Sequence, residues 1–239
     1  MSTFATQLLE FQQQPTVHHA EIFRVLTRHD IWYVPARDGQ PLLQQREEET
    51  HLHIYSEETH LRTHHHTDIS SIEFTSKWLF NNLPPVQSIV IDGHTDHALQ
   101  IPAPLFESLQ RMANSAHLEH VLNSQSKDDN FLVALKDYSA YYLPLIQDAN
   151  GQNHIALAPD HQQRALVAVF TAEDAAQRFL LAATDKLDNI QMDIVTGEKL
   201  FHHLDMLALD GMVLNCYGPT TPVAINKSTL SALAAFNRS

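Results

Sequence analysis

Cysteine and glycine are scarce in this chain, and each shortage removes a class of structure. Cys216 stands alone among 239 residues, so no disulfide can form within the chain. Six glycines leave little material for phosphate-binding loops, and neither a Walker loop nor a Gly-x-Gly-x-x-Gly turn is present. The sequence also lacks the Gly-x-Ser-x-Gly turn of serine hydrolases. We therefore expect no cofactor and no serine-based active site.

Long apolar runs and basic residues are also few. No run approaches the roughly 18 apolar residues that a membrane-spanning helix needs, and the opening MSTFATQLLEFQQQ has no basic or apolar block typical of a secretory signal. Lysine and arginine number 15 against 28 aspartates and glutamates, so the formal charge is -13. This charge repels nucleic acid and anionic lipid and favours a basic protein partner. We expect a cytoplasmic protein that binds neither nucleic acid nor membranes.

The most informative feature that is present is an internal repeat. The segment 23–109 recurs, loosely respelled, between residues 132 and 233. Matching positions include Pro35 with Pro144, Tyr55 with Phe170, Phe80 with Phe201, Val90 with Val213 and Ile101 with Ile225. A repeat of more than about 100 residues is too long for a solenoid unit and indicates a duplicated domain. We predict one domain over residues 1–122, a polar linker at 123–130 and a second domain over 131–239.

Each copy mixes strand and helix patterns in the same order. Alternating or β-branched runs predict strands at 31–36 and 50–55, and Ser56 is expected to cap a short helix after the second of them. Helical spacing predicts helices at 20–27 and 75–82. The fold class predicted is α+β, with two similar tandem domains that each contain a small mixed β-sheet flanked by helices.

Histidine is abundant, with 17 residues, and several lie at metal-binding spacing. His51 and His53 fall on one face of a predicted strand, and His60, His64 and His66 follow closely. Zinc needs three or four converging N, S or O ligands. However, no His-Glu-x-x-His motif is present, and the second copy lacks these histidines. Two interpretations stay open: a polar surface, or a zinc or nickel site.

Other candidate groups are weaker. Cys216 follows a predicted strand and could act as a nucleophile with His202 or His203, but free cysteine is more often a small buried apolar side chain. The acidic run Glu47–Glu49 is typical of a solvated surface. Trp32 and Trp78 occupy apolar positions that favour the core. We therefore expect no enzymatic activity.

The repeat resembles the SseB-like domain, the family named for a bacterial enhanced-serine-sensitivity protein and distinct from the secretion translocon of that name. The resemblance lies in the strands IWYVP and AYYLP, the helix entry VFTAEDAAQRF, the helix GEKLFHHL and the strand DGMVLNCYGP. Cys216 replaces the proline that usually follows the last of these strands. The resemblance implies a small binding module of the bacterial cytoplasm, without catalytic residues or a cofactor.

Two functions are compatible with these patterns. The first is a non-enzymatic bacterial protein-binding module built from two SseB-like domains, for example an immunity or adaptor protein for a basic toxin or effector. The alternative is a metal- or small-molecule-binding regulator that uses the histidine-rich region of the first domain. The sequence leaves open the identity of the partner and the oligomeric state.

Overall fold

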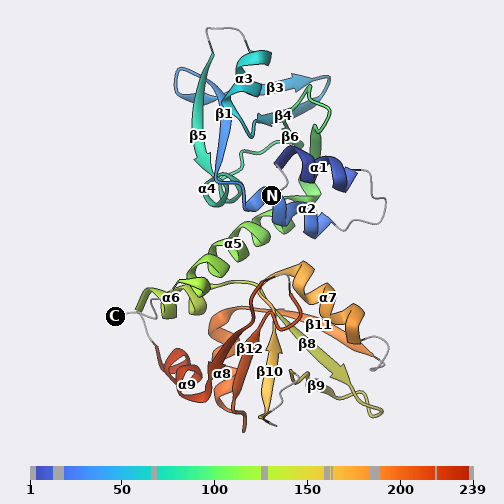
Figure 1. Cartoon of the computed structure of the whole chain (residues 1–239), viewed down its shortest axis with the longest axis vertical. Coiled ribbons are helices and arrows are strands. Elements are labelled where there is room, and N and C mark those ends of the chain that lie inside the picture. The colour runs from blue at the N-terminus through green and yellow to red at the C-terminus, as the bar shows by residue number, and fades with distance from the viewer. Residues whose placement is uncertain are drawn as a thin grey trace. The chain divides into compact units, whose positions relative to one another are not determined.

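The chain divides into two compact units, Met1–Ala116 and His117–Ser239. The division falls inside helix α5, and the predicted linker at 123–130 lies in part, at 125–128, outside the described residues. The computed structural model describes residues 4–12, 19–65, 69–124, 129–158, 162, 164–183, 189–218 and 220–236. Figure 1 shows the first unit in blue to green and the second in green to red. Within the described residues, no helix is long and apolar enough to span a membrane.

The first unit begins with two helices and continues with alternating strands and helices. Its elements are α1 (Phe4–Gln12), α2 (His19–Thr27), β1 (Ile31–Arg37), β2 (Gln40–Pro41), β3 (Leu43–Arg46), β4 (Glu49–Ile54), α3 (Glu58–His64), β5 (Ser70–Thr75), α4 (Ser76–Asn81), β6 (Ser88–Ile91), β7 (Leu99–Pro102), the 3-10 helix η1 (Ala103–Leu105) and α5 (Phe106–Asn123).

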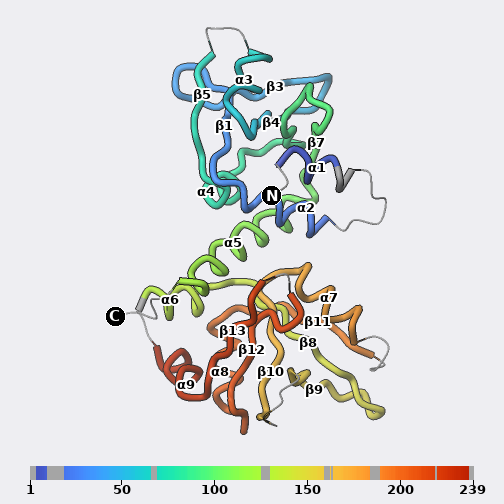
Figure 2. Tube along the Cα trace, viewed as in Figure 1, coloured from blue at the N-terminus to red at the C-terminus, as the bar shows by residue number. Residues whose placement is uncertain are grey.

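The second unit follows the same order with a longer middle helix. Its elements are α6 (Asp129–Asp137), β8 (Tyr141–Gln147), β9 (Asn153–Ile155), β10 (Leu166–Val169), α7 (Glu173–Ala183), β11 (Ile190–Val195), α8 (Gly197–Asp205), β12 (Gly211–Leu214), β13 (Val223–Asn226) and α9 (Lys227–Ala235). The trace in Figure 2 follows this succession of elements through both units.

The two units share their main strand pairings, although β3 adds a fourth strand beside β4 that has no counterpart among the described strands beside β10. β1 pairs antiparallel with β5, and β8 pairs antiparallel with β11. β4 lies parallel to β6, which pairs antiparallel with β7; β10, β12 and β13 repeat this arrangement. In both units an isolated bridge joins the two sheets, Tyr33 with Tyr55 and Tyr142 with Phe170, and the second unit has a further isolated bridge between Leu157 and Val167. These helices and small mixed sheets confirm the predicted α+β fold class.

Equivalent helices also begin in the same way. The hydroxyl of Thr75 accepts a hydrogen bond from the backbone N of Trp78 at the start of α4, at 3.3 Å. Thr196 makes the same contact with Lys199 at the start of α8, at 3.5 Å. Such caps satisfy backbone donors that the first helical turn leaves unpaired. The predicted helix at 75–82 is therefore correct to within a residue.

The second unit has a cluster of apolar side chains on each side of the sheet formed by β10, β12 and β13. The main core includes Tyr141, Val167, Phe201 and Leu214. On the other side, beneath α7, lies a smaller group that we call the side core, composed of Tyr142, Ala156, Ala158, Leu166, Ala168, Phe170, Ala175, Ala176, Phe179 and Ala183. In the first unit, several positions equivalent to the side core hold histidines, and the candidate site lies among them.

Candidate functional site

The site is built where the two parallel strands of the first unit end. Asp92 comes directly after β6, and Ser56 comes shortly after β4. The Asp92 side chain is fully buried. Ser56 donates from its backbone N to Asp92 Oδ1 at 2.8 Å and from its hydroxyl to Asp92 Oδ2 at 2.6 Å. The carboxylate therefore ties the ends of β4 and β6 together.

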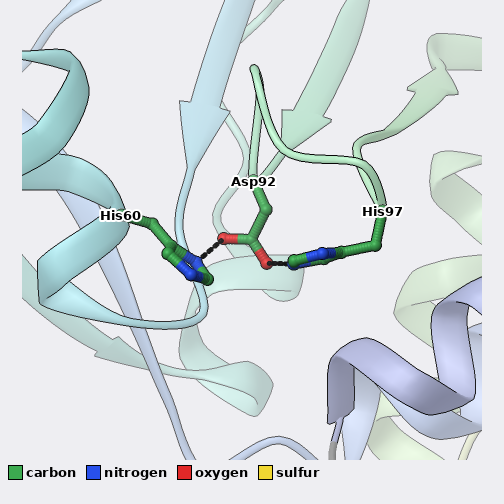
Figure 3. Close-up of side chains that lie close together, drawn as sticks. All are labelled: His60, Asp92 and His97. Carbon is green, nitrogen blue, oxygen red and sulfur yellow. Dashed lines mark hydrogen bonds and ion pairs between the residues drawn. The ribbon is translucent and has the colours of Figure 1, made fainter.

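Two histidines approach the same carboxylate from different segments, as Figure 3 shows. His60, on α3, places Nδ1 at 3.3 Å from Asp92 Oδ1. His97, in the loop before β7, places Nε2 at 3.3 Å from Asp92 Oδ2. The described residues offer His97 Nε2 no contact with hydrogen-bond geometry, although the nitrogen is buried. The ligand atoms of His60, Asp92 and His97 all lie within 4.8 Å of one another.

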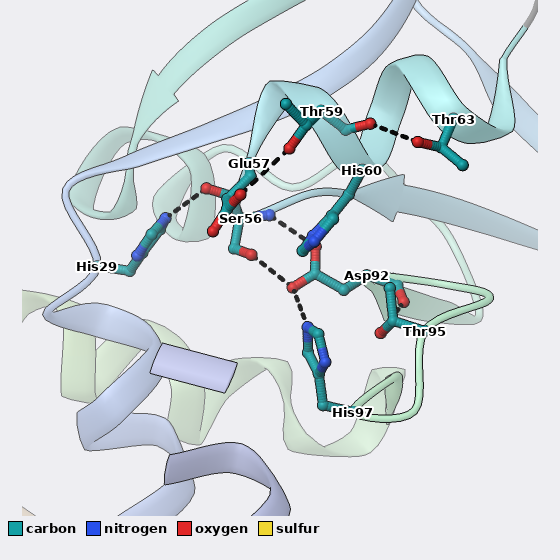
Figure 4. A network of polar contacts seen from close by, with 9 residues as sticks. All are labelled: His29, Ser56, Glu57, Thr59, His60, Thr63, Asp92, Thr95 and His97. Atoms are coloured by element: carbon teal, nitrogen blue, oxygen red, sulfur yellow. Dashed lines mark hydrogen bonds and ion pairs between the residues drawn. The ribbon is translucent and has the colours of Figure 1, made fainter. Parts of the chain in front are cut away.

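A tight turn brings His97 back to the carboxylate. Asp92 has a left-handed backbone, with φ of 45°, and His94 follows with φ of 73°. Thr95 closes the turn by donating from its backbone N and its hydroxyl to the carbonyl oxygen of Asp92, at 3.1 and 2.8 Å. The surrounding polar network, in Figure 4, extends through Ser56 to His29, whose Nε2 lies 3.0 Å from the carbonyl oxygen of Ser56.

The second unit contains a similar structural link in which an amide replaces the carboxylate, and the buried Glu119 lies beside it, with Oε1 3.5 Å from the Thr171 hydroxyl. Asn215 occupies the position of Asp92 and also has a positive φ, 57°. Its Oδ1 accepts a hydrogen bond from the backbone N of Thr171 at 2.9 Å, and its Nδ2 donates to the Thr171 hydroxyl at 2.9 Å. An amide is thus sufficient to join the strand ends in this fold. A buried carboxylate has a larger desolvation cost and needs compensating partners, which His60 and His97 provide in the first unit.

Strand register places histidines where the second unit has its side core. β4 is aligned on β6 as β10 is aligned on β12, with His51 opposite Ser88 and Leu166 opposite Gly211. We call His51, His53, His60 and His64 the histidine layer. Their counterparts in the second unit are Leu166, Ala168, Ala175 and Phe179.

His51 and His53 lie on the strand itself and face a pocket of about 550 Å³. His51 Nδ1 lies 2.7 Å from the Ser88 hydroxyl, and its Nε2 is 3.8 Å from Glu49 Oε2. His53 is buried, and neither ring nitrogen has a hydrogen-bond partner among the described residues. Burial, reinforced by the charge of Arg46, lowers the pKa of His53 from 6.5 to about 4, so its imidazole is neutral at physiological pH. The pocket is lined by Arg46, Glu47, Glu48, Glu49, His51, His53, Val90 and Gln100.

The five predicted metal ligands separate into different environments. His60 alone among them joins the cluster with Asp92 and His97. His51 and His53 line the strand pocket, and His64 stacks on His94 with ring centroids 4.3 Å apart. His66 lies outside the described residues. Asp92 was missing from the prediction, although alignment of IVIDG with MVLN would have set it opposite Asn215 and shown a charge difference at a matched position.

Three other expectations are settled by the side chains. The expectation that Ser56 caps α3 is wrong: the cap residue is Glu57, and the Ser56 hydroxyl binds Asp92 instead. Trp32 is buried as predicted, but the prediction of a buried Trp78 is wrong because it is 49% exposed. Burial raises the pKa of the Cys216 thiol from 9.0 to about 11, which keeps it protonated and a poor nucleophile.

Comparisons with known proteins name no relative by sequence. No family model matches the chain, and no curated protein matches it. Among solved structures, Anabaena Tic22 (protein transport) is similar over 93% of this chain and 100% of that chain, with 8% identity and a TM-score of 0.27. A TM-score of this size carries no argument about fold or function.

Proposed function

We propose that this chain is a non-enzymatic binding protein in which the first unit holds a metal ion or small molecule and the second unit serves as a stable scaffold. One observation carries the proposal. Four side-core positions of the second unit hold Leu166, Ala168, Ala175 and Phe179, whereas the first unit places histidines at the equivalent positions. Polar groups in a buried layer reduce stability unless they are satisfied, and a bound ligand would satisfy the unpaired nitrogens of His53.

The test replaces three residues of the histidine layer with the side chains of the second unit. We expect the triple variant His51→Leu, His53→Ala, His60→Ala to lose ligand binding, because it removes three imidazole groups. The introduced side chains are those of Leu166, Ala168 and Ala175 at the equivalent positions of the second unit. The measurement is the Tm of untagged protein against a panel of divalent metal ions and small polar molecules, since a ligand that binds the folded state raises the Tm. Far-UV circular dichroism verifies that the variant folds.

A matched control removes exposed histidines from the second unit. The double variant His202→Ala, His203→Ala alters two exposed side chains on α8 and should respond to ligand as the natural chain does. If no compound raises the Tm of the natural chain, or if the triple variant responds equally well, the proposal is wrong.

A second candidate function is the binding of a protein partner, and a surface aromatic pair favours it. Trp78 stacks on Phe74 with ring centroids 4.2 Å apart and an interplanar angle of 7°. Lys199 and Val195 occupy the equivalent positions of the second unit, so the aromatic pair is specific to the first. Exposed tryptophan is enriched in interaction hot spots, and the charge of -13 favours a basic partner.

Replacement of Trp78 with the lysine of the second unit tests this surface. We expect Trp78→Lys to weaken capture of a basic partner at least about 10-fold, because large aromatic anchors carry much of the binding energy. Leu181→Lys, at a position 69% exposed on α7, is the control for an added surface charge. A partner that binds both variants as it binds the natural chain would exclude the Trp78 surface.

The SseB-like resemblance supports this second candidate and extends it to an immunity or adaptor role in the bacterial cytoplasm. The family assignment and the compartment stay predictions.

A further inference from the structure

We infer that His60, Asp92 and His97 form a binding site for one divalent transition-metal ion of the zinc type. The inference rests on the proposed function and names the ligand class and the residues that hold it. The donor set is two imidazole nitrogens and one carboxylate, brought together from α3, the end of β6 and the loop before β7. Borderline metals such as zinc accept this mixture of nitrogen and oxygen, whereas magnesium and calcium prefer oxygen alone.

The donors lie near the spacing that a tetrahedral ion requires. Zinc binds histidine nitrogen and carboxylate oxygen at about 2.0–2.2 Å, so two ligands of a tetrahedral ion lie about 3.3–3.5 Å apart. His60 Nδ1 lies 3.3 Å from Asp92 Oδ1, and His97 Nε2 lies 3.3 Å from Asp92 Oδ2, so the two imidazoles approach different oxygens of one carboxylate. All the donor atoms lie within 4.8 Å of one another, so small side-chain movements are sufficient to surround one ion. Three protein ligands leave the fourth position for water or for a group of a partner.

The surroundings of the donors resemble the outer shell of a metal centre. Ser56 holds both oxygens of the carboxylate through its backbone N and its hydroxyl, at 2.8 and 2.6 Å. Hydrogen bonds of this kind orient ligating carboxylates and raise metal affinity. His97 Nε2 is buried, lies 3.3 Å from Asp92 Oδ2 and has no contact with hydrogen-bond geometry among the described residues, so an ion bound to the same carboxylate would give this nitrogen a partner.

Comparison with the second unit indicates that the cluster of His60, Asp92 and His97 is more than a structural link. Asn215 joins the same strand ends through Thr171 with an amide in place of the carboxylate, and Ala175 stands where the first unit has His60. The residues from Asn215 to Val223 include no histidine that could take the place of His97. The first unit therefore carries a carboxylate and two imidazoles that the fold does not need for joining its strands.

Zinc titration of the metal-free protein tests the site. The untagged chain, purified without a metal column and treated with a chelator, is titrated in competition with a chromophoric chelator, and bound metal is counted by mass spectrometry. We expect one zinc per chain and no comparable affinity for magnesium. Binding of cobalt should give the visible absorption typical of low coordination number and nitrogen and oxygen ligands.

Three variants locate the ion. Asp92→Asn should weaken zinc binding at least about 100-fold while keeping the fold, since asparagine already occupies this position in the second unit; His97→Ala should do the same. Ser56→Ala should weaken binding about 10- to 100-fold through the orientation of the carboxylate. His202→Ala, His203→Ala serves as the control for adventitious binding and should keep full affinity.

The outcomes separate this inference from the proposed function. Unchanged affinity in Asp92→Asn and His97→Ala would overturn the site. Loss of zinc in His51→Ala, His53→Ala with full binding by Asp92→Asn would place the ion in the strand pocket, which also overturns the site but leaves the proposed function standing. If the chain binds a small molecule but no metal, the metal site is overturned and the proposed function stands. If it binds neither, both the metal site and the proposed function are contradicted.

Discussion

At the scale of single residues, the buried imidazole of His53 links the stability of the first unit to pH. Its pKa is lowered to about 4, whereas an unfolded chain would protonate it near 6.5. Between these values the unfolded state binds more protons than the folded state, so the free energy of unfolding falls as the pH decreases from 6.5 to about 4. Above 6.5 the residue is neutral in both states and contributes no pH dependence.

We expect His53→Ala to flatten this dependence. The lowered pKa corresponds to about 2–3 kcal/mol of stability lost by the natural chain at the acidic end of the range. Alanine is the residue of the second unit at this position, Ala168, and does not titrate. The measurement is urea unfolding of both proteins across the interval. Part of the dependence should survive in the variant, because burial also lowers the pKa of His64; parallel curves for the two proteins would contradict the prediction.

The candidate site shows how far single residues can be interpreted from the sequence. Histidine spacing indicated the correct unit and included His60, because clustering along the chain is visible without a structure. Asp92 lies 32 positions from His60, and only the pairing of β4 with β6 brings its carboxylate to α3. The role of Ser56 was mistaken for the same reason: a local pattern predicts a helix cap, but the hydroxyl binds a more distant carboxylate.

At the scale of elements, strand β12 depends on a glycine at its first position. Gly211 has φ of 155°, and a Cβ atom there would lie 2.2 Å from the carbonyl oxygen of Ile225 on β13. The obstacle is backbone, which cannot rotate away as a flexible side chain can. Ser88 occupies the equivalent position of the first unit, opposite Pro102 on β7, so this close approach is particular to the second unit.

We expect Gly211→Ala to destabilise the chain by about 2–3 kcal/mol, the sum of backbone strain and the displaced strand. Gly151→Ala is the matched control, because Gly151 also has a positive φ, 78°, but no atom lies within 4 Å of the added methyl group. That control should cost about 1–2 kcal/mol from conformation alone. Chemical denaturation of both variants measures the difference, and equal losses would show that the close approach is relieved without strain.

At the same scale, the middle helices explain why the elements were easier to predict than their contacts. α7 carries apolar residues at helical spacing, and α3 begins at the matching position with histidines on the corresponding face. Helical and strand periodicity is local, so it survives in a single sequence. The neighbours of a helix depend on chain segments far away, and periodicity contains no information about them.

At the scale of the whole molecule, the two units share their main strand pairings and differ in the layer beneath the middle helix. The second unit keeps an apolar layer under α7, which supports stability through burial. The first unit has histidines at several of the equivalent positions and Asp92 where the second unit has Asn215, and these polar groups cost stability and provide donors. A division of this kind allows one copy to change its chemistry while the other keeps the chain folded.

The sequence by itself determined the fold class and the repeated order of strands and helices, because both are encoded in local periodicity and in matching apolar positions. It also indicated that the first copy is the polar one. Only the tertiary structure decided which polar groups meet: His60, Asp92 and His97 come from three separate segments, and strand pairing together with the turn closed by Thr95 brings them to one point. Convergence of this kind depends on contacts between distant residues, which no local pattern contains.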